Sequence, residues 1–294
     1  MTDKERRVLT ISMVVSMFLW GLSWPSAKVI TYYASPINLV IYRYIIVTFT
    51  LLPILWYFKI KILLPLKAIP YVLFSAFLLA LYSVVMFKGL KVGFAGAGGV
   101  FVTTLNPIMA YMLALLIQKK IPSINESAAL FLGLIAGMTL LEIWKNSDEL
   151  WLAGNLLFLL AAFIWALMSR VTALSSRFGS AFSFSFWMYL STFLILIPLM
   201  DFSEIQITIQ KSDFLFWSNL FFGGAIVTSL ATSIYFYATT KLGSEKASSF
   251  IFLVPFSAGI SSWLLLGEKF EIHTLIGGTI AILAVYLLQK RKKA

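Results

Sequence analysis

Residues 181–200 read AFSFSFWMYLSTFLILIPLM, a run of 20 residues without one charged side chain. Residues 150–168, LWLAGNLLFLLAAFIWALM, form a second run of the same kind. A helix rises about 1.5 Å per residue, so ~20 apolar residues are enough to cross the ~30 Å hydrocarbon layer of a bilayer. Both runs therefore predict transmembrane helices.

The composition of the whole chain agrees with a membrane protein. Apolar residues make up 60% and charged residues 12% of the 294 residues, whereas soluble proteins carry about 25% charged residues. A large soluble core would leave too little polar surface to cover it. The chain has no cysteine, which excludes disulfides and thiolate metal sites. The net charge of +11 could indicate a nucleic-acid partner, but the distribution of the charges favours a membrane protein.

Apolar runs, with the Pro, Gly and charged residues that interrupt them, divide the chain into ten predicted spans. They cover residues 8–30, 37–58, 68–87, 95–117, 124–144, 150–169, 181–200, 214–238, 247–266 and 272–289. The first span follows a basic start and is too long for the apolar part of a signal peptide, so we expect an uncleaved helix. The short connections leave no room for a soluble enzymatic or nucleic-acid-binding module.

Basic residues fall mainly on one side of these spans. If both termini are inside, 16 of the 23 Lys and Arg residues are cytoplasmic and six are on the other side, while Arg43 lies within the second span. Cytoplasmic loops carry an excess of Lys and Arg. We therefore expect a multi-pass protein of the bacterial inner membrane with N- and C-termini in the cytoplasm.

The two halves of the sequence align with each other. At an offset of 145 the first span matches the sixth, with Phe18, Trp20 and Leu22 opposite Phe163, Trp165 and Leu167. Further matches in the same order are Tyr44 with Tyr189 at 145, Lys91 with Lys241 at 150, and Pro107 with Pro255 at 148. Because each copy has an odd number of spans, the second copy must insert upside down. The sequence thus predicts inverted five-helix repeats at residues 1–145 and 146–294, an arrangement typical of secondary transporters.

The repeated residues also resemble a known family. Phe-Leu-Trp-Gly-Leu-Ser-Trp at residues 18–24 resembles the first-helix motif of the EamA branch of the drug/metabolite transporter superfamily. Arg43 stands where that family often has an arginine, and residues 88–107 and 241–282 resemble corresponding regions of its two copies. The resemblance implies ten helices around a central cavity with alternating access. It also implies transport of amino acids or other metabolites, more commonly as export than as import or exchange.

Arg43 is the first candidate for the substrate site. A charge within a span is costly, by about 2.5 kcal/mol or more, and such residues face a cavity or a partner. Arg43 could bind an anionic group of a substrate, or it could be a structural residue tied to backbone carbonyls. Its counterpart in the second repeat is Met188, so the symmetry of the repeat does not require an arginine.

Aromatic and hydroxyl side chains supply the other candidates. Trp20 and Trp165 lie too deep in their spans for belt residues, which prefer headgroup depth, and their equivalent positions could form opposite walls of one cavity. Thr228, Thr232 and Tyr235 follow a helical spacing. Further candidates near prolines or deep in spans are Trp24, Tyr82, Asn106 and Ser257. The alternatives are helix packing for the aromatic residues and interhelical hydrogen bonds for the polar ones.

The predicted function is secondary transport of small amphipathic metabolites, amino-acid-like or nucleoside-like, with export favoured over import or exchange. We expect small-molecule substrate and membrane lipid as partners, no nucleic acid, no cofactor and no metal, and a monomer or weak dimer. No Asp or Glu lies in the middle of a span, which argues against coupling through a membrane carboxylate. A membrane enzyme should show clustered histidines or acids in its spans, and a lipid translocase should open laterally, so both are weaker readings.

Overall fold

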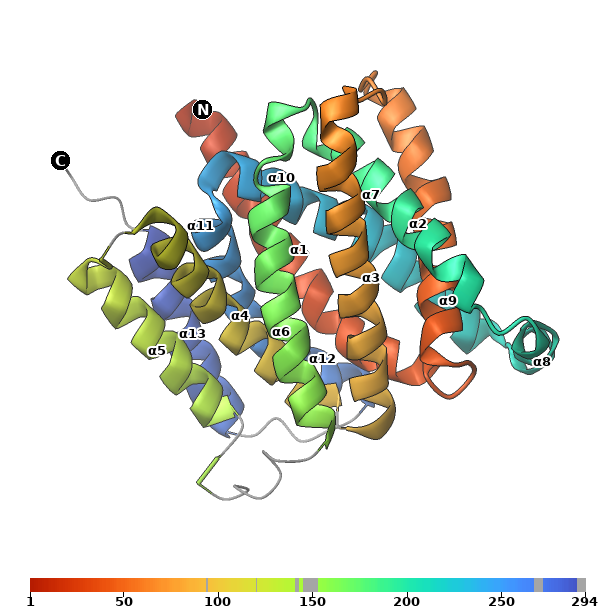
Figure 1. The fold of residues 1–294 in the computed structure, drawn as a ribbon. Coiled ribbons are helices and arrows are strands. Elements are labelled where there is room, and N and C mark those ends of the chain that lie inside the picture. Colours follow the sequence, from red (N-terminus) through yellow and green to blue (C-terminus); the bar gives the residue numbers. More distant parts are fainter. Residues whose placement is uncertain (94, 120, 141–142, 145–152, 267–271, 290–294) are drawn as a thin grey trace.

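The computed structural model describes residues 1–93, 95–119, 121–140, 143–144, 153–266 and 272–289, and every regular element within those ranges is a helix (Figure 1). The longer helices are α1 (Asp3–Ile30), α2 (Pro36–Tyr57), α3 (Ile69–Val92), α4 (Ala95–Gln118), α5 (Ile124–Leu140), α6 (Ala153–Thr172), α7 (Ala181–Leu196), α12 (Val254–Leu266) and α13 (Ile272–Gln289). Between α7 and α12 lie α8 (Ser203–Lys211), α9 (Phe214–Phe221), the π-helical segment η5 (Phe222–Thr232), α10 (Ser233–Leu242), α11 (Ser244–Ser249) and η6 (Phe250–Leu253). Short 3-10 turns are η1 (Leu66–Ala68), η3 (Ser175–Arg177) and η4 (Ile197–Leu199).

Within the described residues these elements form the ten predicted spans, because α9, η5 and α10 continue one another, as do α11, η6 and α12. Six of the helical segments are long and apolar enough on their own to cross a membrane, and two shorter apolar helices cover Val102–Ile117 and Ile124–Thr139. The prediction of an all-helical ten-span membrane protein is confirmed. The expected boundary between the two repeats, after residue 145, lies outside the described residues.

The helices pack in a pattern that repeats with the two halves exchanged. Equivalent helices contact each other directly, α2 with α7 and α5 with α13. The remaining contacts come in matched pairs: α3 packs on α6 as η5 packs on α1, and α4 packs on α6 as α12 packs on α1. This exchange places a pseudo-twofold axis between the halves. The same exchange explains why the residues that match between the two halves, at offsets of 145–150 positions, follow the same order in each half.

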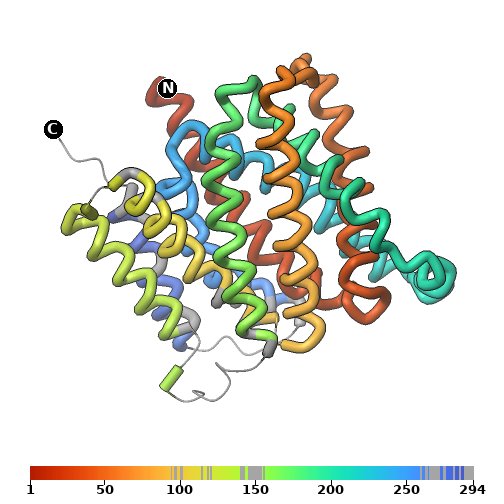
Figure 2. The backbone as a smooth tube through the Cα atoms, viewed as in Figure 1, coloured from red at the N-terminus to blue at the C-terminus, as the bar shows by residue number. Residues whose placement is uncertain are grey.

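Both ends of the bundle can be followed in Figure 2. The bundle end where α1 begins is called the terminal end below, and the end holding the α1–α2 connection is called the distal end. Local capping fixes where helices begin at each end. Thr2 and Glu5 form a capping box at the start of α1, and Ser35 caps α2 ahead of Pro36, a residue suited to a first helical turn.

The helix α8 was not predicted, since residues 201–213 were expected to be a simple short connection. It lies at the distal end beside the start of α2 (Figure 1). The buried Asn38 side chain donates to Asp201 O at 2.9 Å and to Glu204 Oε2 at 2.7 Å. Because these contacts join residues more than 160 positions apart, hydropathy and local propensity could not reveal them.

Asp213 lies just before the span that follows α8. Its carboxylate accepts from the backbone N–H of Phe216 at 2.8 Å and from the Tyr33 hydroxyl at 2.9 Å. These two hydrogen bonds hold the pKa of Asp213 below its ordinary value, and the bond from the Phe216 backbone has the larger effect. Asp213 thus caps α9 and ties it to the α1–α2 connection.

Candidate functional site

A cavity of about 60 Å³ lies between the two halves, where α1, α2, α3, α4, α6, η5 and η6 approach one another. Eight of the ten predicted site residues line it: Trp20, Trp24, Arg43, Tyr82, Asn106, Trp165, Thr228 and Thr232. Sequence reasoning missed several lining residues, among them Tyr44, Ser83 and Thr103. The structure thus brings together side chains from both repeats that are up to about 230 positions apart in the chain.

The depth of the cavity follows from positions along the helices. Trp20 lies ten residues before the end of α1, Arg43 seven residues after the start of α2, and Trp165 twelve residues after the start of α6. At 1.5 Å per residue these side chains are about 15, 11 and 18 Å from the distal end. The cavity therefore lies near the middle of the bundle.

Two pairs of repeat-equivalent aromatic residues meet at this cavity. The rings of Trp20 and Trp165 are edge to face with centroids 5.1 Å apart. The rings of Tyr44 and Tyr189 are stacked at 5.9 Å. Residues related by the repeat can touch each other only close to the axis that relates them. The cavity is therefore built on the pseudo-twofold axis, where inverted-repeat transporters hold their substrates.

The stacked tyrosines also make equivalent hydrogen bonds. Tyr44 Oη lies 3.0 Å from Ser83 Oγ, and Tyr189 Oη lies 3.3 Å from Ser233 Oγ. The two serines are separated by 150 positions, the offset found at Lys91 and Lys241. The symmetry of the repeat thus extends to polar contacts that were not part of the sequence alignment.

Arg43 breaks this symmetry. Its Nε donates to Thr228 Oγ1 at 2.9 Å and to Gly223 O at 3.2 Å, and Thr228 Oγ1 in turn donates to Gly223 O at 2.8 Å. The Nη1 and Nη2 atoms have no hydrogen-bond partner among the described residues. The position of Met188, its repeat counterpart, is fully buried and apolar.

Three further polar atoms around the cavity are buried without a hydrogen-bond partner. They are Trp20 Nε1, Trp165 Nε1 and Asn106 Oδ1. The other end of the Asn106 amide donates to Ala162 O at 3.2 Å, which fixes the amide oxygen as the free acceptor. Buried polar groups are nearly always hydrogen-bonded in folded proteins, so this group of unpaired atoms is typical of a ligand site.

The last two predicted residues lie beside the cavity lining. Tyr235 is fully buried, and its ring lies 5.1 Å from that of Trp20. Ser257 lies where α1 crosses α12, and its Oγ donates to Met17 O at 3.1 Å and to Val254 O at 2.9 Å. In its present position Ser257 is part of helix packing.

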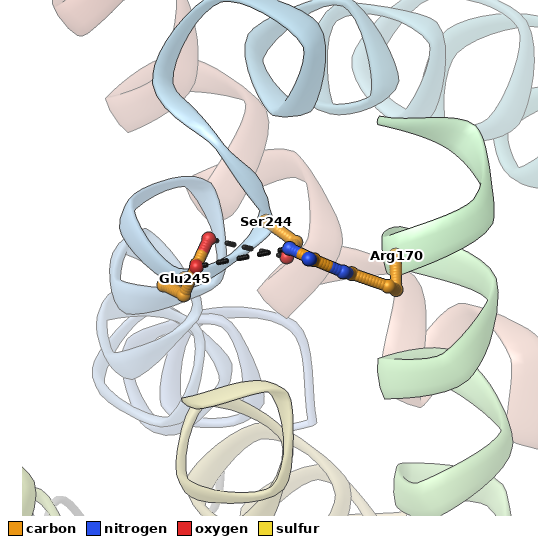
Figure 3. A network of polar contacts seen from close by, with 3 residues as sticks. All are labelled: Arg170, Ser244 and Glu245. Carbon is orange, nitrogen blue, oxygen red and sulfur yellow. Dashed lines mark hydrogen bonds and ion pairs between the residues drawn. The ribbon is translucent and has the colours of Figure 1, made fainter. Parts of the chain in front are cut away.

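A layer of polar contacts lies on the side of the cavity that faces the terminal end. Tyr235 Oη lies 2.8 Å from Ser169 Oγ and 2.9 Å from Ser248 Oγ, which joins α6, α10 and α11. One turn nearer the terminal end, Arg170 Nη1 lies 3.8 Å from Glu245 Oε1, and Ser244 Oγ donates to the same carboxylate (Figure 3). These contacts therefore lie between the cavity and the terminal end.

The π-helical segment η5 forms one wall of the cavity. In this winding Thr228 Oγ1 and Thr232 Oγ1 bond to carbonyls five positions earlier, at Gly223 and Val227. π-Helical turns occur frequently at functional sites. Sequence reasoning placed Thr228, Thr232 and Tyr235 on one α-helical face. With the wider π-helical winding both threonines line the cavity, whereas Tyr235 belongs to the polar layer next to it.

The acidic residues of the described chain stand at helix starts or in connections. Glu126, for example, accepts from the Ser123 backbone N–H at 2.9 Å at the start of α5. The part of the chain that is described contains no group of three His, Asp or Glu side chains placed to hold a metal ion. The predicted substrate-site residues within the spans therefore carry a cation, aromatic rings, an amide or hydroxyl groups.

Comparison with known proteins identifies the family. The sequence profile of the EamA-like transporter family matches the chain twice, over residues 9–141 and 152–289. The chain belongs to this family. The double match by the EamA-like profile agrees with the exchanged packing of the two halves.

Two relatives and one solved structure are similar to this EamA-family chain. WAT1-related protein At3g02690, chloroplastic, of Arabidopsis thaliana is 28% identical over 73% of the chain, and the match spans 54% of that protein, about half its length. Uncharacterized transporter YdfC of Bacillus subtilis is 26% identical over 95% of the chain and 90% of that protein. A solved crystal structure superposes on 97% of the chain and 98% of its own with a TM-score of 0.72. At 14% identity this likeness concerns the fold alone.

Proposed function

We propose that this EamA-family chain is a secondary transporter that moves small amphipathic metabolites across a bacterial inner membrane by alternating access. The observation that carries the proposal is the contact between Trp20 and Trp165 at the cavity, with ring centroids 5.1 Å apart. A site on the axis between inverted repeats can be exposed to either side when the repeats exchange conformations. The relative YdfC is named as an uncharacterized transporter, which supports the same class.

The cavity must enlarge when it binds an amphipathic metabolite. Its present volume is about 60 Å³, whereas pockets that enclose drug-sized ligands measure ~300–1,000 Å³. The aromatic walls therefore have to move apart, and the polar layer at Tyr235 and Arg170 has to open for release at the terminal end. The cavity and this layer lie in series along the bundle, as alternating access requires.

Several finer features belong to the same proposal. The N- and C-termini face the cytoplasm, each repeat moves as one unit, and the protein works as a monomer or weak dimer. Export is the favoured direction, with import or obligate exchange as the alternative. The site is neither an enzyme active site nor a nucleic-acid surface in this proposal, because its free groups suit reversible binding of a small organic molecule.

Transport can be tested with purified protein in proteoliposomes. A panel of labelled metabolites is assayed for uptake and for release, with protein-free liposomes and a Trp165→Ala variant of normal fold as controls. We expect saturable flux of at least one amphipathic compound, reduced in the variant. Flux equal to that of empty liposomes for every compound, with folded protein and intact vesicles, would overturn the proposal.

A further inference from the structure

Building on the proposed transport function, we propose that the substrate is an organic anion whose planar carboxylate binds Nη1 and Nη2 of Arg43. The cavity selects such anions over zwitterions and neutral analogues of the same size. A neutral N–H or O–H of the substrate donates to Asn106 Oδ1, and its apolar part lies against the rings of Trp20 and Trp165.

The first support is the way Arg43 is held. A structural arginine in a membrane would direct its terminal nitrogens to backbone carbonyls. Arg43 instead uses only Nε, on Thr228 Oγ1 and Gly223 O, and lines the cavity with the rest of the guanidinium group. The anchored Nε fixes the plane of the fork and leaves two parallel N–H donors. This is the geometry that binds a carboxylate with two hydrogen bonds.

The second support is the balance of charge. Arg43 is the one charged residue among the described residues that line the cavity, and no Asp or Glu lies beside it there. A charge at this depth is costly unless an opposite charge accompanies it. A carboxylate supplies that charge. A zwitterion would bring an ammonium group for which the described lining holds no carboxylate.

The third support is the kind of unpaired polar atom near the arginine. Trp20 Nε1 and Trp165 Nε1 are donors, and both are buried without a partner. Donors stabilise an anion or a carbonyl oxygen and cannot satisfy an ammonium group. Asn106 Oδ1 is a buried, unpaired acceptor of the described lining, and one N–H or O–H of the substrate can donate to it. An aromatic hydroxy acid is one molecule with all these features.

Thr228 is a positioning residue in this scheme. Its hydroxyl accepts from Arg43 Nε at 2.9 Å and donates to Gly223 O at 2.8 Å. Valine has nearly the same shape without the hydroxyl, so Thr228→Val should loosen the guanidinium group while leaving its charge in place. We expect affinity to fall by several-fold with the preference for anions unchanged, and Thr228→Ser to restore it.

The test uses two matched series of compounds that differ in charge at constant shape. One series is lactate, alanine and lactamide, and the other is phenyllactate, phenylalanine and phenyllactamide. Affinity is measured by tryptophan fluorescence in detergent, and flux by counterflow in proteoliposomes. We expect the anion of at least one series to bind tenfold or more tightly than its zwitterion and amide. Tighter binding of phenyllactate than of lactate would place the ring against the tryptophans.

Variants then assign the effect to Arg43. Arg43→Gln should weaken binding of the anion by roughly 100-fold or more, the loss expected from two hydrogen bonds to a charged group, and should abolish the preference over the amide. Arg43→Lys should restore part of the affinity, since lysine keeps the charge and lacks the fork. Lys211→Gln, on the exposed helix α8, is the matched control and should leave binding unchanged.

The outcomes separate this inference from the transport proposal. Equal affinity for anion, zwitterion and amide, or an Arg43→Gln variant that folds and keeps the preference, overturns the anion site even if transport is measured. If Arg43→Gln does not fold, Thr228→Val decides, because unchanged anion affinity in that variant also overturns the inference. Flux of no compound in the wider metabolite panel overturns the transport proposal, whatever the fluorescence experiment shows.

Discussion

Gly21 lies next to Trp20 in α1, where this helix crosses α12. A Cβ atom at Gly21 would lie 1.8 Å from Ser257 Oγ, 2.6 Å from the backbone nitrogen of Ala258 and 2.7 Å from Ser257 Cβ. Rotation of the Ser257 hydroxyl could relieve the first contact. It cannot relieve the contact with backbone, so Gly21→Ala must move α1 away from α12 by about 0.4 Å or more to reach the 3.0 Å limit of real contacts.

The size of the effect follows from two opposing terms. Adding a methyl group to a well-packed crossing costs about 1–3 kcal/mol, and three simultaneous contacts place Gly21→Ala near the upper value. Replacing glycine by alanine inside a helix gains about 1 kcal/mol. The net loss of unfolding free energy should thus be about 2 kcal/mol. Small residues at helix crossings in membranes serve this close approach.

Gly223→Ala is the matched control, because the nearest atom to its added Cβ is Arg43 Cζ at 3.7 Å, an ordinary contact. Reversible unfolding in detergent and denaturant should therefore separate the two variants by about 2–3 kcal/mol. Adding Ser257→Ala to Gly21→Ala should recover only part of the loss, since the contact with backbone remains. Equal stability of the two glycine variants would refute the close crossing of α1 and α12.

Reporter fusions after Lys61 should be cytoplasmic and fusions after Lys211 external, and the reverse result would contradict the inverted repeat and the charge bias. Trp20→Phe and Trp165→Phe should each weaken substrate affinity with little loss of thermal stability, because the indole N–H groups of both are unpaired; unchanged affinity in both stable variants would make them packing residues. Glu126→Gln should leave substantial transport, since its carboxylate caps α5, and abolition of flux with a normal fold would identify it as a coupling residue.

Sequence reasoning succeeded where the membrane itself imposes the pattern. The length of apolar runs predicted the spans because hydrocarbon thickness sets helix length. The repeat led us to expect Trp20 and Trp165 on opposite walls of one cavity, whereas in the structure both line the cavity and their rings contact each other at 5.1 Å. Arg43 was expected to face a cavity or a partner because a charge in hydrocarbon is costly. These predictions depended on one physical constraint each and needed no knowledge of side-chain contacts.

The features that were missed depend on contacts between distant parts of the chain. The π-helical winding of η5 depends on threonine hydroxyls that bond five positions back, whereas the residues themselves suggested an α-helical face. Ser257 resembled a cavity residue because it follows Pro255, yet the glycine at position 21 of α1 leaves the space that its hydroxyl fills. Neither the winding nor the pairing with Gly21 has a signal in local sequence.

The cavity combines a symmetric frame with an asymmetric lining, and the two parts serve different needs. Alternating access requires two conformations of similar energy, which equivalent contacts such as Tyr44 with Ser83 and Tyr189 with Ser233 favour. Recognition requires that one orientation of the substrate be preferred. A fully symmetric site could bind a polar molecule in two opposite ways, whereas Arg43 has the apolar Met188 as its counterpart. The anionic end of a substrate should therefore stay at the α2–η5 wall in both conformations, while the packing around it changes sides.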